Sequence, residues 1–199
     1  MEFIEKKHII TFNGESGTGK SFIKKRVAKT FSMYSCHSTG DTVRQMAREA
    51  GIPFEEFNAY HAKHGTSFDE IIDGELKRIS QEEDHYLIDA RLGACFIPNS
   101  FKVLIKADRV IRARRRLKHF LENDFEQYKH TTAAQVLSDL DKRDRENNER
   151  YEKKYGFSVN DESKYDLVID NNGDNIIEEV FHTIWYDYNE WLKQPVFQV

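Results

Sequence analysis

The chain has 199 residues, of which 39% are hydrophobic and 32% are charged, and its formal net charge is −4. This length suits a single domain, spanning residues 1–199, with a full hydrophobic core. The acidic balance argues against a general nucleic-acid-binding protein. No apolar run approaches the roughly 18 residues of a membrane-spanning helix, and the first residues run directly into a predicted strand, so we expect neither a membrane segment nor a cleaved signal peptide.

The chain contains two cysteines, Cys36 and Cys95, whose spacing matches no metal or redox motif. We interpret both as buried free thiols in a reducing compartment, which predicts a cytoplasmic protein. No internal repeat or low-complexity linker divides the chain, and this agrees with a single domain.

Predicted strands and helices alternate along the chain. Short apolar runs rich in β-branched and aromatic residues predict strands at 8–12, 33–37, 85–90, 101–107 and 165–170. Helical periodicity predicts helices at 20–31, 41–50, 53–64, 67–80, 109–121, 133–154 and 174–193. This alternation is typical of a parallel sheet covered by helices on both faces. We therefore expect a three-layer α/β/α fold with a five-stranded parallel sheet, whose ligands bind beyond the carboxyl ends of the strands.

The loop after the first predicted strand carries the most specific motif, because residues 14–21 read GESGTGKS and match the phosphate-binding loop G-x-x-x-x-G-K-[ST]. Glycines let the backbone curl until its N–H groups converge on phosphate oxygens. The lysine can reach the β- and γ-phosphates, and the hydroxyl after it can hold Mg²⁺. We predict a P-loop NTPase fold that binds ATP through Gly14, Glu15, Ser16, Gly17, Thr18, Gly19, Lys20 and Ser21. The side chains between the glycines are expected to point mostly away from the phosphates.

Three aspartates lie where they could serve such a site. Asp89 ends the third predicted strand and could hold Mg²⁺ directly or through water, or could cap the following turn. Asp41 follows Gly40 and is expected to cap the helix that carries Arg44. Asp73 lies in a predicted helix, where it could contact an acceptor or face water, and both interpretations stay open.

Arginines follow the predicted strands and recur in a polar segment near residues 118–150; they are Arg44, Arg91, Arg109, Arg112, Arg143, Arg145 and Arg150. A nucleoside monophosphate acceptor is already ionised, so it needs cations rather than a base, and arginine suits its phosphate best. A hydroxyl acceptor usually needs a carboxylate instead. Any single arginine could be a solvated surface residue, and the RARRR run at 112–116 leaves contact with RNA as a less favoured alternative.

The segment of about residues 118–150 is rich in charged and amide side chains and poor in apolar ones. A small helical lid that closes over the site is the functional interpretation, because kinases exclude water during transfer. A solvated pair of surface helices is the alternative.

Beyond the phosphate loop, the order of several segments resembles the cytidylate kinases, most closely the short type described from archaea. The segments are HIITFNGESGTGKS, STGDTVRQMA, GIPFEEFNAYHAKHG, DEIIDGELKRI, DARLG and RYEKKYGFSVND, followed by YDLVID. The resemblance implies a nucleoside monophosphate kinase that transfers the γ-phosphoryl group of ATP, with Mg²⁺, to CMP or dCMP. It also implies a small-molecule enzyme with no nucleic-acid or membrane partner, and kinases of this size often work as monomers.

The resemblance also implies roles for individual residues. Among the catalytic residues, Arg112, Arg143 and Arg150 would surround the transferring phosphoryl group when the lid closes, and Lys20 with the loop amides would hold the donor phosphates. Ser38, Arg44 and Asp73, from the acceptor-binding helices at about 38–80, and Arg91, after the third predicted strand, would bind the acceptor. Ser21 and Asp89 would hold the metal.

Two departures put the acceptor in doubt more than the reaction. Ala90 stands where the family usually has glycine, and Asn147 stands where an acidic residue is expected. Two alternatives stay open, and these departures motivate the second of them. One is a small-metabolite kinase in which Asp89 or Asp41 acts on a hydroxyl acceptor. The other is a P-loop regulatory protein that binds nucleotide without turnover.

Overall fold

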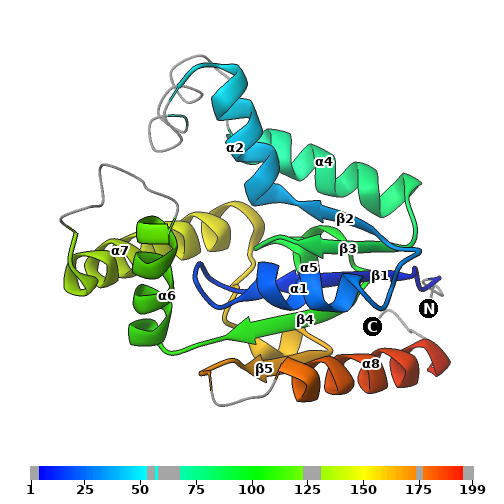
Figure 1. Cartoon of the computed structure of the whole chain (residues 1–199). Helices are drawn as coiled ribbons and strands as arrows, with labels where there is room; N and C mark the ends of the chain where they lie inside the picture. Colours follow the sequence, from blue (N-terminus) through cyan, green and yellow to red (C-terminus); the bar gives the residue numbers. More distant parts are fainter. Residues whose placement is uncertain (1–4, 53–56, 58–67, 123–130, 174–176, 195–199) are drawn as a thin grey trace.

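The computed structural model describes residues 5–52, 57, 68–122, 131–173 and 177–194. Five parallel strands form one sheet in the order β2-β3-β1-β4-β5 (Figure 1). The strands are β1 (Ile9–Asn13), β2 (Ser35–Ser38), β3 (Tyr86–Asp89), β4 (Phe101–Lys106) and β5 (Leu167–Asp170). All of them lie within two residues of the bounds predicted from the sequence, so the predicted parallel sheet is confirmed.

The helices are α1 (Lys20–Ala28), α2 (Thr39–Glu49), α4 (Phe68–Glu82), α5 (Gly93–Phe96), α6 (Arg109–Glu122), α7 (Ala133–Tyr155) and α8 (Ile177–Lys193), with a short 3₁₀ turn at Glu162–Lys164. The predicted helix at 53–64 lies, apart from Phe57, outside the described residues. The sequence analysis missed the short helix α5, because four residues are too few to show periodicity.

Strand β1 shows how the sheet receives a helical layer on each face. Ile10 and Phe12 point into the larger core, which α1 and α8 close. Ile9 points to the opposite face, where Leu76 of α4 and Ile97 beside α5 cover it. Successive strand residues point to opposite faces, so an almost unbroken apolar strand needs helices on both sides. The expected three-layer α/β/α architecture is confirmed.

Helices α6 and α7 lie beyond the carboxyl ends of the central strands (Figure 1). Ala113 of α6 packs with Val136 and Leu140 of α7 in a small apolar cluster. Thr132 begins α7 with a capping box to Gln135, in which each residue satisfies a free backbone group at the helix start. This pair of helices occupies most of the segment predicted to form a lid.

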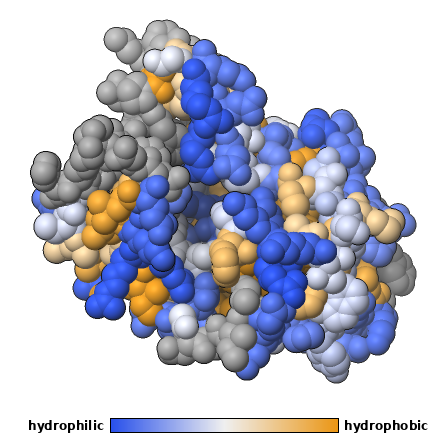
Figure 2. Space-filling model, viewed as in Figure 1, coloured by the Kyte–Doolittle hydropathy of each residue, from blue (hydrophilic) through white to orange (hydrophobic). Residues whose placement is uncertain are grey.

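The surface agrees with a polar chain. Figure 2 shows mostly hydrophilic residues on this face, with hydrophobic residues in small separate groups. Among the described helices, none is long and apolar enough to cross a membrane. The prediction that both cysteines are buried is wrong for Cys36, which is exposed because β2 lies at the edge of the sheet, while Cys95 is half-buried; both are free thiols.

Candidate active site

The P-loop joins β1 to α1 and needs glycine for steric reasons. Gly14 has φ 123°, and a Cβ there would lie 2.3 Å from the carbonyl oxygen of Ile105. Gly19 has φ 99°, and a Cβ there would lie 2.4 Å from the amide nitrogen of Asn171. At Gly14 the close neighbour is backbone, so no side chain fits, whereas at Gly19 it is the end of a side chain that can move, and the positive φ is what favours glycine. The loop leads into the N-terminus of α1, whose free N–H groups and dipole favour a phosphate.

Asn13, at the end of β1, ties this loop to the next element of the site. Its buried amide donates to Thr11 O at 3.0 Å and to Val103 O at 3.2 Å. Its carbonyl oxygen accepts a hydrogen bond from the backbone of Ala94, at 2.8 Å. A buried amide must satisfy its hydrogen-bonding groups, and by doing so Asn13 fixes α5 and the turn that carries Arg91. The sequence analysis missed this role.

Lys20 begins α1 and lies over the loop. Its ammonium group donates to Glu15 O at 2.7 Å, and Thr18 Oγ1 donates to the same carbonyl oxygen at 3.0 Å. Enclosure by protein lowers the pKa of Lys20 to about 8; Asp89 opposes this shift, while Arg91 and Arg112 add to it. A lysine in these surroundings gains much from an incoming phosphate, because the phosphate supplies the negative charge that it lacks.

Ser21 and Asp89, the two predicted metal ligands, are brought together. The Ser21 hydroxyl donates to Asp89 Oδ2 at 2.5 Å, and Asp89 is buried at the carboxyl end of β3. Hard oxygen donors of this kind fit Mg²⁺, which usually keeps several waters and takes only a few protein ligands. The site therefore suits the metal that the sequence predicts.

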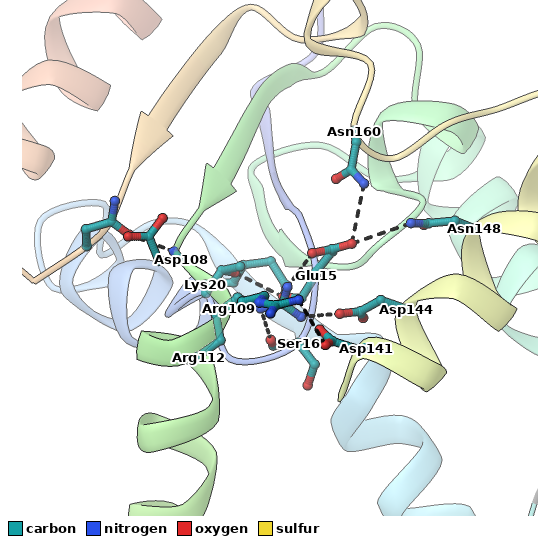
Figure 3. Close-up of polar contacts among 12 residues, drawn as sticks. Glu15, Ser16, Lys20, Asp108, Arg109, Arg112, Asp141, Asp144, Asn148 and Asn160 are labelled. Carbon is teal, nitrogen blue, oxygen red and sulfur yellow. Dashed lines mark hydrogen bonds and ion pairs between the residues drawn. The ribbon is translucent and has the colours of Figure 1, made fainter. Parts of the chain in front are cut away.

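Arg112 of α6 lies at the centre of a dense polar cluster (Figure 3). Its Nε donates to Ser16 O at 2.8 Å, and its terminal nitrogens pair with the carboxylates of Glu15 and Asp144. The guanidinium is buried, with 6% of the side chain exposed. The arginine thus joins the P-loop, α6 and α7.

Glu15 and Asp144 are site residues that the sequence analysis undervalued. Glu15 does not lie free on the surface: its Oε1 accepts from the amides of Asn148 and Asn160, each at 3.4 Å (Figure 3). Asp144 lies on the buried stripe of α7, and burial raises its pKa although Arg112 opposes that shift. A signal was present, because the buried residues Val136, Leu140, Asp144, Asn147 and Tyr151 follow helical spacing. Polar side chains at core-facing positions of that stripe mark a site.

Arg91 and Arg143 differ from Arg112, because neither has an ion pair or hydrogen bond to another residue in the described part of the chain. Arg143 has an exposed surface, but the protein around it reduces its hydration and lowers its pKa to about 10, and the positive charges of Arg91 and Arg116 add to this shift. A cation whose pKa is lowered by neighbouring cations lies in a positive potential that favours an anion. Arg109 lies farther out, where it pairs with Asp141 at 3.3 Å and joins α6 to α7.

On the acceptor side, Ser38 rather than Asp41 begins α2. Ser38 Oγ accepts from the backbone N–H of Asp41 at 3.4 Å, so the predicted cap at Asp41 is wrong. The serine is both the last residue of β2 and the residue before the first helical turn, where an N-cap must stand. Asp41 instead pairs with Arg44 at 2.5 Å. Partial burial alone would raise the pKa of Asp41, but Arg44, Ser38 and Lys24 together outweigh it and lower that pKa.

The second half of α7 lies against α4 through polar contacts that Arg150, Lys154 and Tyr155 make with Asp69 and Asp73. Arg150 Nε pairs with Asp69 at 2.8 Å, and its Nη2 donates to Asn147 Oδ1 at 2.8 Å. One turn later along both helices, the Tyr155 hydroxyl donates to Asp73 Oδ2 at 2.5 Å. Arg150 therefore lies on the α4 side of the site, apart from the Arg112 cluster. Asp73 is buried, so the interpretation in which it faces water is wrong.

Four buried polar atoms on α4 and α7 have no hydrogen-bond partner in the described part of the chain: Asp73 Oδ1, Asp144 Oδ1, Asn147 Nδ2 and Glu75 Oε2, the last of which lies 3.4 Å from His37 Nε2 in an ion pair. Buried polar groups are nearly always satisfied, so such atoms in one region indicate a ligand or ordered water. Ala90 has a different role, because its methyl group packs in the apolar cluster beneath α4. The methyl group that Ala90 has in place of the family's usual glycine is therefore accommodated within the core.

Comparison with known sequences identifies the family of this chain. The sequence profile of the cytidylate kinase-like family matches residues 9–173. The chain belongs to this family. The cytidylate kinase of Archaeoglobus fulgidus is 31% identical over 88% of this chain and 91% of its own, and that of Methanothermobacter thermautotrophicus is 30% identical over 82% and 95%. A protein of Lacinutrix mariniflava named S-adenosylmethionine-dependent nucleotide dehydratase is 32% identical over 81% of this chain but only 32% of its own length.

Solved structures show the same fold at much lower identity. An uncharacterized protein from Eubacterium ventriosum has a TM-score of 0.63 at 14% identity and covers 91% of this chain and 98% of its own. Shikimate kinase from Bacteroides thetaiotaomicron has a TM-score of 0.58 at 13% identity and covers 94% and 98%. This fold is that of P-loop kinases, and together with the family it supports a phosphotransferase.

Proposed function

We propose that the protein is an ATP-dependent nucleoside monophosphate kinase that phosphorylates CMP or dCMP. One observation carries the proposal: Arg91 and Arg112 lie close enough to Lys20 of the P-loop to lower its pKa, and Arg91 likewise lowers the pKa of Arg143. Such a concentration of cations suits two highly charged phosphate groups held side by side. In-line transfer between them needs electrostatic stabilisation and no obligatory protein base.

The donor side of the proposal uses the loop and its supports. Backbone N–H groups of residues 14–21 and Lys20 would hold the ATP phosphates, and Ser21 with Asp89 would hold Mg²⁺. The ion would neutralise charge on the β- and γ-phosphates when bound. Arg115 and Asn171 hold the loop from outside, because they donate to Thr18 O at 3.3 and 2.8 Å. The loop is thus fixed before nucleotide arrives.

The acceptor side rests on hydrogen-bond chemistry. The Tyr155 hydroxyl occupies one oxygen of Asp73, and burial together with Asp73 raises the pKa of Tyr155, so it remains a donor. The other oxygen of Asp73 is a buried acceptor without a donor in the described part of the chain. Cytosine presents an exocyclic amino group at the position where uracil presents a carbonyl oxygen. We infer that Asp73 favours the cytosine base, in agreement with the names of the relatives.

The decisive experiment measures ADP release with ATP and Mg²⁺ across CMP, dCMP, UMP, AMP and GMP. We expect turnover to peak with CMP or dCMP and to vanish in Lys20→Ala. Asp73→Asn is expected to lower the preference for CMP over UMP, because an amide can also donate to the uracil carbonyl. Unchanged transfer by Lys20→Ala to every acceptor would contradict the proposal.

The same panel separates the alternatives. A hydroxyl-acceptor kinase would phosphorylate sugars or polyols and no nucleotide. Asp41 is a poor candidate for its base, because Arg44 lowers the pKa of this exposed carboxylate. A regulatory protein would bind ATP in calorimetry without transfer to any acceptor.

A further inference from the structure

A second cluster of ligand-type side chains lies at the opposite end of the sheet from the P-loop. His8 precedes β1, and Asp84 and His85 precede β3. One ligand atom from each of the three side chains lies within 4.8 Å of the other two. The two imidazole rings stack with their centroids 4.7 Å apart. None of these residues takes part in the proposed phosphoryl transfer.

The backbone beneath this cluster is fixed by several hydrogen bonds. Lys7 Nζ donates to the carbonyl oxygens of Gln81 and Glu83, at 3.0 and 2.8 Å. The His8 carbonyl accepts from Tyr86 N at 3.1 Å, and the His85 carbonyl accepts from Ser35 N at 2.9 Å. The three side chains therefore project from a framework set by three neighbouring strands.

The orientation of each side chain is also controlled. Asp84 Oδ1 accepts from the backbone N–H of His8 at 2.6 Å, which leaves Oδ2 facing His85 Nδ1 at 3.3 Å. His8 Nδ1 lies 3.2 Å from the Tyr188 hydroxyl, which leaves Nε2 for another partner. Outer hydrogen bonds to a histidine and to a carboxylate are the supports that protein metal sites use.

The backbone of His85 has φ 58°, the one positive φ at a non-glycine residue in the described part of the chain. This conformation is unfavourable for a residue with a Cβ, and strain of this kind is often retained where it serves a function. Here it turns the imidazole of His85 toward His8 and Asp84. The donor set, the outer hydrogen bonds and the strained backbone are three separate observations on one cluster.

We propose that His8, Asp84 and His85 bind a divalent first-row transition-metal ion such as Zn²⁺. Two imidazoles and one carboxylate form a three-ligand set with open positions, which suits such ions and discriminates against Mg²⁺. Bond lengths of about 2.0–2.2 Å require the ligand atoms to approach by roughly 1 Å. Asp84 and His85 are partly exposed, with 43% and 44% of their side chains accessible, so rotation can provide this approach.

The test uses the full-length protein without an affinity tag and measures Zn²⁺ affinity by competition with a chromogenic chelator. His85→Asn keeps a residue that tolerates positive φ, and Asp84→Asn keeps an oxygen acceptor for the His8 N–H group. His182→Ala removes an exposed histidine of α8 as the matched control. We expect the wild type and His182→Ala to bind one more Zn²⁺ tightly than the other two variants, whose affinity falls at least about tenfold.

Two further measurements do not depend on kinase activity. Zn²⁺ is expected to raise the melting midpoint of the wild type but not of His85→Asn, and excess Mg²⁺ is expected to leave bound Zn²⁺ in place. Equal Zn²⁺ binding by all four proteins, absence of tight binding in the wild type, or displacement by Mg²⁺ would each overturn the proposal.

Discussion

The cations of the candidate site fall into two groups that differ in what they contact. Arg112 is buried and uses all of its nitrogens on Ser16, Glu15 and Asp144. Arg91 and Arg143 have neither an ion pair nor a hydrogen bond within the described part of the chain, and Arg143 is exposed. Arg112 thus resembles a residue of the core, whereas Arg91 and Arg143 resemble residues of a binding surface.

This difference separates two tasks that a phosphoryl-transfer site must perform. A buried and fully paired arginine fixes the loop and the helices, and an incoming phosphate must compete with the carboxylates for it. Unpaired arginines contribute little to folding but raise the local positive potential, so a phosphate gains their attraction without breaking an existing contact. The comparison can be tested by substitutions that affect one task and leave the other intact.

The largest expected effect comes from Arg112→Ala, with Arg143→Ala as its counterpart. Both changes remove a positive charge from the proposed transfer site, and each is expected to lower kcat by about 10²–10³. Only Arg112→Ala leaves the buried carboxylate of Asp144 and the half-buried carboxylate of Glu15 without this partner, which costs about 3–5 kcal/mol of stability, whereas Arg143→Ala changes stability by less than about 0.5 kcal/mol. Steady-state kinetics and urea unfolding measure the two effects. Equal stability of the two variants would remove the distinction.

The pH dependence of ATP binding tests Lys20, whose pKa is lowered to about 8 by enclosure within the protein. Below that pH the ammonium is charged and ready for phosphate. Above it, binding ATP requires uptake of a proton, so we expect the affinity to fall by up to about tenfold per pH unit. Calorimetry at several pH values in buffers of different ionisation enthalpy measures both the affinity and the proton uptake. Lys20→Arg is the control, because arginine stays protonated, and a flat profile for the wild type would contradict the assignment.

The sheet and the P-loop were predictable because their signals are local. A short apolar run such as residues 101–106 is stable in a chain of this length only as a buried strand. The loop motif in turn predicts glycines with positive φ, and Gly14 and Gly19 both have φ above +80°. The cap of α2 was misassigned because Ser38 and Asp41 are both good capping residues, and their choice depends on where β2 ends. The exposure of Cys36 likewise depends on strand order, which no local pattern specifies.

The polar partners of the site were harder to predict, because they join segments that are far apart in the sequence. Glu15 and Arg112 are separated by 97 positions and Asp73 and Tyr155 by 82. The presence of arginines near the strand ends could be inferred from the chain, but not which of them is paired. That pairing arises from how α7 packs against α4 and α6. The side chains that decide this packing are charged or amide residues, which leave no hydrophobic pattern in the sequence.

A smaller effect is expected from Glu15→Gln. Glutamine keeps an oxygen acceptor near Arg112, Asn148 and Asn160 but removes the negative charge that competes with phosphate. We expect ATP to bind about three- to tenfold more tightly, equivalent to roughly 1 kcal/mol for a half-buried pair. Glu162→Gln, which breaks the exposed pair with Lys106, serves as the control and should leave ATP affinity unchanged. Weaker ATP binding by Glu15→Gln would show that the carboxylate positions Arg112 for the nucleotide instead of competing with it.

The smallest effect is expected from replacing arginine by lysine at an unpaired position. Arg91→Lys retains the positive charge, and no protein partner in the described part of the chain requires the guanidinium fork. Only the fork's contact with the acceptor phosphate would be lost, so the KM for the acceptor should rise only about two- to fivefold. At the paired position, the lysine of Arg112→Lys cannot contact Ser16, Glu15 and Asp144 at once, because its ammonium group is a point charge without a planar fork. Its kcat should therefore fall much further than that of Arg91→Lys, with a lower melting temperature. If the two lysine variants were equally impaired in kcat and equally stable, the contacts of Arg112 would be incidental, and charge alone would account for both groups.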